Sequence, residues 1–159
     1  MLSRYWCRYR ALPSPQRRDL WGALWRLLLV RALMVFGVHR TRRMLAGTRC
    51  LQAGAVELDA LKRWQERALA LKRVGHRLPG VHCLARSLAL RWWMRSSGVD
   101  VRLIMGARRS QGVLDSHSWL EWAGVPVDEA PEVTRGYQVF CREGDATEQS
   151  AQRDPRRNG

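Results

Sequence analysis

A cysteine, a histidine and two adjacent acids have the types and the order of a nucleophilic triad. Cys83 lies near the start of a predicted helix, His117 begins a predicted strand, and Asp128 and Glu129 lie on the strand after it. A helix N-terminus favours a thiolate, because its dipole and its free N–H groups stabilise negative charge. The same N–H groups can donate to an oxyanion. With the histidine as base and an acid to orient it, the pattern predicts covalent catalysis by the cysteine.

Each of these residues also has a simpler interpretation when it is taken alone. A single cysteine such as Cys83 is often a small buried hydrophobic residue, and His117 could be a strand-edge histidine with no role. His82 adjoins the cysteine, but neighbours on a helix point about 100° apart, so we expect it to be exposed. The order of Cys83, His117 and the acids favours catalysis over these separate explanations.

The hairpin after His117 leaves two candidates for the acid. A tight two-residue turn at Ala123-Gly124 puts Asp128 on the face of His117, because side chains alternate along a strand. A three-residue turn shifts this parity and puts Glu129 there instead. Because the turn length is open, the alternation of side chains along the strand leaves both acids as candidates.

The elements that must position these residues fall into a helical half and a strand half. Helices are predicted over about 20–36, with Asp19 as N-cap and Gly37 at the end, over 55–78 and over 81–97, with a short helix or turn over 39–50. Strands are predicted over 99–107, 117–122, 125–129 and 136–140, with a polar loop over 108–116. A flexible lead-in (1–19) and a disordered tail (142–159) flank one domain over 20–141. This order predicts an α+β fold that ends in a small antiparallel sheet.

The net charge of +14 invites a nucleic-acid or membrane interpretation, but its distribution argues against one. All but two of the 28 basic residues are arginine, and they are spread along the whole chain. An acidic partner or a peptide substrate is a weaker second inference from the charge. We therefore expect no nucleic-acid partner.

The remaining cysteines and the most apolar segment narrow the class of protein further. Cys7, Cys50 and Cys141 are far apart, form no CxxC pair and are expected to be inert, so no metal site is predicted. Segment 20–38 is interrupted by arginines and falls short of the roughly 20 apolar residues that a membrane span needs. We interpret it as a mostly buried helix, or as one that lies on a membrane or partner surface, in a cytoplasmic protein.

Two motifs together resemble a known family. The stretches "HCLARSLAL" and "HSWLEWAGVPVDEAPEV" look like those of the transglutaminase-like, papain-fold B proteins, which remove the leader from lasso-peptide precursors. The resemblance covers about residues 20–140. It implies that Cys83 is the nucleophile, His117 the base and Glu129 the acid, with Asp128 as the alternative. Two departures are a glutamate where the family most often has aspartate, and Ser118 in place of a small apolar residue.

The same resemblance implies an activity and a set of partners. The substrate would be a precursor peptide, cleaved without cofactor or metal. Some family members carry a winged-helix module that binds the leader, and the residues before 55 have neither the length nor the strand pattern for one. A separate winged-helix recognition protein and an ATP-dependent lasso cyclase are therefore the expected partners. The alternatives are acyl transfer by the same triad and, more distantly, an Arg/Trp-rich protein that binds nucleic acid or a membrane surface.

Overall fold

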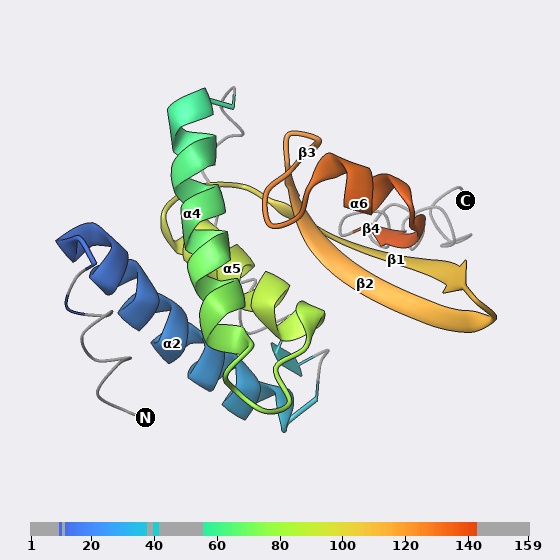
Figure 1. Ribbon diagram of the computed structural model, residues 1–159, viewed down its shortest axis with the longest axis horizontal. Helices are drawn as coiled ribbons and strands as arrows, with labels where there is room; N and C mark the ends of the chain where they lie inside the picture. Colours follow the sequence, from blue (N-terminus) through green and yellow to red (C-terminus); the bar gives the residue numbers. More distant parts are fainter. Residues whose placement is uncertain (1–9, 11, 38–39, 42–55, 143–159) are drawn as a thin grey trace, which may run out of the picture.

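Helices and a sheet form two layers in the computed structural model, which describes residues 10, 12–37, 40–41 and 56–142. The long helices are α2 (Ser14–Met34), α4 (Leu58–Gly75) and α5 (Cys83–Ser96), and the short α6 (Pro131–Arg135) follows later. The strands are β1 (Arg102–Ser110), β2 (Val113–Trp122), β3 (Val125–Pro126) and β4 (Gln138–Arg142). They form an antiparallel sheet of order β3-β2-β1-β4, and the long helices lie to one side of it (Figure 1). The predicted α+β class, with helices first and a small antiparallel sheet after, is confirmed.

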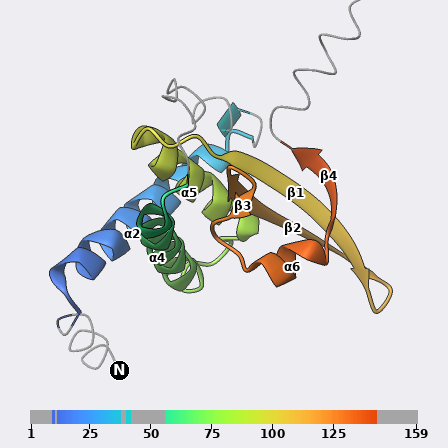
Figure 2. The same cartoon turned by 90° about the horizontal axis from the view of Figure 1, so that it is seen from above.

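Helix α5 joins the two layers. It contacts α2 and α4 on one side and strands β1 and β2 on the other, as the view from above shows (Figure 2). Leu88, Leu90 and Met94 of this helix are almost completely buried and share a core with Leu103 and Leu120 of the sheet. A helix that is apolar around most of its circumference is expected in such a central position. The first residue of α5, Cys83, is therefore held beside β2 by the core itself.

Helix α2 begins earlier than the sequence indicated. It starts at Ser14, with Pro15 in its first turn, where proline is well tolerated. Asp19 lies inside the helix and accepts from Arg67 Nε at 3.3 Å instead of capping the N-terminus. The predicted cap at Asp19 is therefore wrong, and so is the expectation of little structure for residues 14–19. The predicted end is close, since α2 stops just before Gly37, which has a φ of +99°.

Helix α2 has two apolar faces with different surroundings. Ala23, Leu27 and Val30 are fully buried, whereas Trp25 and Leu28 are 56% and 48% exposed. The expectation of a mostly buried helix thus holds for one face only. Within the described part of the chain, no helix has the length and apolarity to cross a bilayer.

The region expected to be a polar loop, 108–116, is instead a continuous β-hairpin. β1 and β2 pair without interruption from Arg102–Glu121 to Ser110–Val113, around a turn at Gln111-Gly112. Both turn residues have positive φ, which suits the right-handed twist of a two-residue hairpin. The outer half of the hairpin is largely exposed, so it carries no alternation of apolar and polar residues for a sequence pattern to detect.

The second turn agrees with one of the two predicted geometries. Trp122 pairs with Val125 across a two-residue turn in which Ala123 and Gly124 have positive φ. β3 then ends at Pro126 rather than continuing to residue 129, and α6, which was not predicted, follows. The last predicted strand is present as β4, displaced by two residues. The predicted helix or turn over 39–50, except for residues 40–41, and the tail after 142 lie outside the described residues.

Candidate active site

Cys83 is the first residue of α5, as the sequence predicted. The preceding residue, His82, is extended and exposed, and no side chain caps the helix. The N–H groups of the first turn therefore remain available to an anion. Gly80, with a φ of +73°, makes the turn that separates this helix from α4. The thiol thus lies where the helix end stabilises negative charge.

His117 of β2 forms a hydrogen bond with the thiol. This bond is the largest cause that lowers the pKa of Cys83 to about 7, from a usual value of 9.0. The side chain and backbone of Ser118 lower it further, against the opposing effect of burial. Hydrogen bonds with Cys83 and then Glu129 raise the pKa of His117 to about 9. The two shifts favour a thiolate–imidazolium pair near neutral pH.

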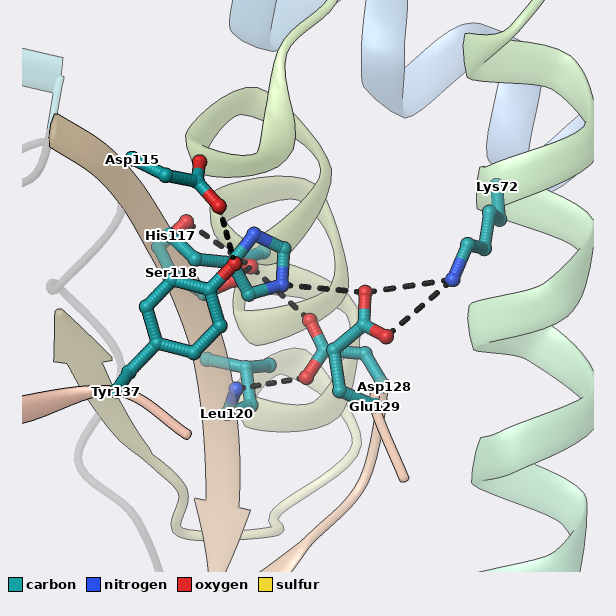
Figure 3. Close-up of polar contacts among 9 residues, drawn as sticks. Lys72, Asp115, His117, Ser118, Leu120, Asp128, Glu129 and Tyr137 are labelled. Carbon is teal, nitrogen blue, oxygen red and sulfur yellow. Dashed lines mark hydrogen bonds and ion pairs between the residues drawn. The ribbon is translucent and has the colours of Figure 1, made fainter. Parts of the chain in front are cut away.

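Glu129 lies on the other side of the imidazole. Its Oε1 is 3.3 Å from His117 Nε2, which leaves Nδ1 for the thiol. Lys72 of α4 approaches from the opposite direction and donates to both carboxylate oxygens at 3.3 Å (Figure 3). The pKa of Glu129 is lowered, first by its hydrogen bond with His117 and then by the charge of Lys72. The carboxylate thus stays ionised between two cations.

Asp128 faces away from the imidazole. Its carboxylate accepts from the backbone N–H of Leu120 at 2.7 Å and from the Ser87 hydroxyl at 3.0 Å (Figure 3 shows the carboxylate between β2 and α5). Burial raises its pKa to about 6. These contacts tie β2 to the first turns of α5, so Asp128 holds together the two elements that carry His117 and Cys83.

The early end of β3 explains why parity does not place Asp128 beside His117. With a two-residue turn, a continuing β3 would put Asp128 on the histidine's face. The last ladder bond runs from Val127 N to Leu120 O at 3.0 Å. The Asp128 carboxylate then takes the Leu120 N–H that a backbone carbonyl of a continuing strand would use. The chain turns away after this point, and Glu129 comes to lie beside the imidazole.

Two aromatic rings flank His117 on its face of the sheet. The ring centroid of Tyr137 is 5.4 Å from that of His117, and the Trp119 centroid is 6.3 Å away. The Tyr137 hydroxyl donates to Asp115 at 2.8 Å, and Asp115 also pairs with Arg108 at 3.0 Å. The imidazole is therefore restrained by stacking as well as by Glu129.

Three contributors to this site were not predicted from the sequence. Lys72 carried no signal beyond being one of only two lysines, and Tyr137 lies after a helix that was not predicted. Ser118 was noted only as a departure from the family pattern, yet its hydroxyl and backbone both stabilise the thiolate. The described residues contain no group of three or more His, Cys, Asp or Glu side chains that could hold a metal ion.

A cysteine at a helix start, a histidine on a strand and an acid beside it, in an α+β domain, are the arrangement of papain-like cysteine enzymes. A family model of the Transglutaminase-like superfamily matches residues 23–142, so the chain belongs to this superfamily. Its members include cysteine peptidases and transglutaminases. Comparisons with curated proteins and with solved structures found no match.

Proposed function

We propose that the protein is a cysteine peptidase that cleaves the leader from a ribosomally synthesised precursor during lasso-peptide maturation. The observation that supports catalysis is the contact of one imidazole with both Cys83 and Glu129, with the thiol at a helix N-terminus. The choice of a precursor peptide as substrate rests on the resemblance of the two motifs around Cys83 and His117.

In the proposed reaction the Cys83 thiolate attacks the scissile carbonyl carbon, and the carbonyl oxygen becomes an oxyanion. The backbone N–H of Cys83 and its neighbours in the first turn donate to that oxyanion. The His117 imidazolium then protonates the leaving amine as the C–N bond breaks, which leaves an acyl thioester. Neutral His117 next deprotonates a water molecule that attacks the thioester, and the thiolate is regenerated. Glu129 keeps Nε2 protonated so that Nδ1 exchanges the proton.

The proposed partners follow from the same activity. A separate winged-helix recognition protein would present the leader, and an ATP-dependent lasso cyclase would close the ring in the released core. We propose no nucleic-acid partner and a cytoplasmic location. Peripheral contact of the exposed face of α2 with a membrane stays an alternative.

The test is the reaction itself, followed by mass spectrometry in water enriched in ¹⁸O. With the cognate precursor and recognition protein, we expect one cleavage and one ¹⁸O atom in the new carboxylate, and no cleavage by Cys83→Ala. Cys141→Ala, which removes another partly buried thiol, should cleave normally. Retained cleavage by Cys83→Ala would contradict the proposal. A product cross-linked by an isopeptide bond, without ¹⁸O, would show acyl transfer instead.

A further inference from the structure

A second polar hollow lies between α2 and α4, away from the thiol. Its volume is about 570 Å³, and we call it the arginine groove. Four arginines line it, Arg18 and Arg26 from α2 and Arg63 and Arg67 from α4, together with the acids Asp19 and Glu66. Positive charge is therefore in excess within the groove.

Two of these guanidinium groups are fixed on tryptophan rings. The guanidinium carbon of Arg26 is 4.2 Å from the Trp93 ring centroid. That of Arg67 is 4.5 Å from the Trp64 centroid and 5.1 Å from the Trp93 centroid. Arg26 Nη1 also donates to Gly22 O at 3.2 Å. Because stacking already restricts both arginine side chains, they would lose little further conformational entropy when a ligand binds.

The charge of the groove is only partly balanced. Arg67 donates to Asp19, whereas Arg26 Nε is buried and has no hydrogen-bond partner among the described residues. Burial, and then the nearby charge of Arg67, lower the pKa of Arg26. Arg18 and Arg63 are exposed at the rim. An anion bound here would offset the repulsion between neighbouring guanidinium groups, which is the condition for a favourable anion site.

We infer that the arginine groove binds the carboxylates of an acidic peptide segment. Planar guanidinium groups match carboxylates, and the Trp93 ring in the groove suits the apolar part of a peptide. Trp93 lies on the same helix as Cys83, ten residues on, about 15 Å along the axis at 1.5 Å per residue.

The position of the groove suits a peptide that also reaches the thiol. An extended segment of at least roughly five residues spans 15 Å. This inference rests on the proposed function for its ligand, since the acidic segment would belong either to the precursor or to the recognition protein. The binding itself requires no catalysis and can be tested apart from it.

The first experiment measures binding to Cys83→Ala protein, which cannot turn over a substrate. Fluorescein-labelled hexaglutamate is titrated at physiological salt and followed by anisotropy, with hexaglutamine as the neutral probe. The groove variant is Arg63→Gln/Arg67→Gln. The control, Arg102→Gln/Arg135→Gln, removes the same charge from exposed positions outside the groove. We expect the groove variant to bind hexaglutamate about tenfold more weakly than the control, the equivalent of one ion pair.

Because Arg67 stacks on Trp64, changing it could disturb the fold. A second variant therefore leaves Arg67 in place. Arg18→Gln/Arg63→Gln changes only exposed residues and should weaken binding in the same direction. Equal weakening by the groove and control variants would show that only the net charge matters and would overturn the inference. It would also be overturned by a larger loss of affinity for a thymidine oligonucleotide than for hexaglutamate.

A third measurement identifies the source of the acidic segment. If it lies in the precursor, changing its acids to amides should raise KM for the unsubstituted enzyme but not for the groove variant. If the acidic segment lies in the recognition protein, the groove variant should bind that protein more weakly. Changing the precursor's acids to amides should then leave KM unchanged. When neither the precursor nor the recognition protein responds to the groove variant, the inference is wrong even if cleavage occurs.

Discussion

At the scale of single residues, the site is a chain of four charged or polarised groups, Cys83, His117, Glu129 and Lys72. They contact one another in that order: Cys83 and His117 shift each other's pKa, and His117 and Lys72 both lower the pKa of Glu129. The thiol must lose its proton, which happens above its pKa of about 7, and the imidazole must keep its proton, which happens below about 9. The proposed activity should therefore be highest between these values and fall on both sides.

Lys72 is expected to position Glu129 and to set this pH window. A cation near the site lowers the pKa of both the Cys83 thiol and the His117 imidazolium. Removing the charge in Lys72→Met should therefore move both limbs of the kcat/KM profile to higher pH. Lys72→Arg should restore the original limbs. Lys62→Met removes the chain's other lysine from an exposed position on the same helix and should leave the profile unchanged. Identical profiles for Lys72→Met and Lys62→Met would rule out the positioning role.

At the scale of elements, Asp128 joins α5 to β2 at the base of the site. Asp128→Ala should lower the free energy of unfolding by about 1–3 kcal/mol, because the buried N–H of Leu120 loses its acceptor. Asp128→Asn should retain much of this bond. Urea unfolding followed by tryptophan fluorescence measures both effects.

The pH dependence of stability separates the charge of Asp128 from its hydrogen bonds. Burial raises its pKa from 3.8 to about 6 in the folded state, so folding takes up a proton in this range. The contribution of Asp128 to stability should consequently decrease as pH rises from 3.8 to 6. Asp128→Asn should remove that slope, and an unchanged slope in this variant would contradict the assignment.

Gly106 allows the sheet to approach Tyr137 closely. It is paired with His117 across β1 and β2, and an added Cβ would lie 2.9 Å from Tyr137 Cβ and 3.0 Å from the Trp119 ring. Gly106→Ala should therefore destabilise the fold by about 1–3 kcal/mol and disturb the stack on His117. Gly136→Ala, whose Cβ would meet nothing closer than 3.5 Å, is the matched control in the same unfolding measurement. Equal stability of the two variants would exclude this packing role.

At the scale of the whole molecule, the sequence predicted what depends on local pattern. The helix that begins with Cys83, the turn at Ala123-Gly124 and the α+β order all leave periodic or turn signals. The hairpin over 108–116 left none, because its largely exposed residues show no regular alternation of apolar and polar side chains. The start of α2 was wrong because an aspartate inside a helix looks like a cap when its partner, Arg67, is distant in sequence.

The local sequence pattern does not decide which of the two acids lies beside His117. The turn geometry was one of those considered, yet parity then pointed to Asp128, whereas Glu129 lies beside His117. The deciding contact is the one between Asp128 and the Leu120 N–H, which ends the ladder early. Lys72 likewise reaches the site only because α4 packs against α5. Such contacts between distant segments require the assembled fold.

Activation of Cys83 by His117 is tested most directly by the pH dependence of alkylation at that thiol. Iodoacetamide labelling followed by peptide mass spectrometry resolves Cys83 from the chain's other cysteines. We predict an apparent pKa of about 7 for Cys83, which returns toward the usual 9.0 in His117→Ala. An unperturbed thiol in the unsubstituted protein, or the same apparent pKa in both proteins, would contradict this prediction.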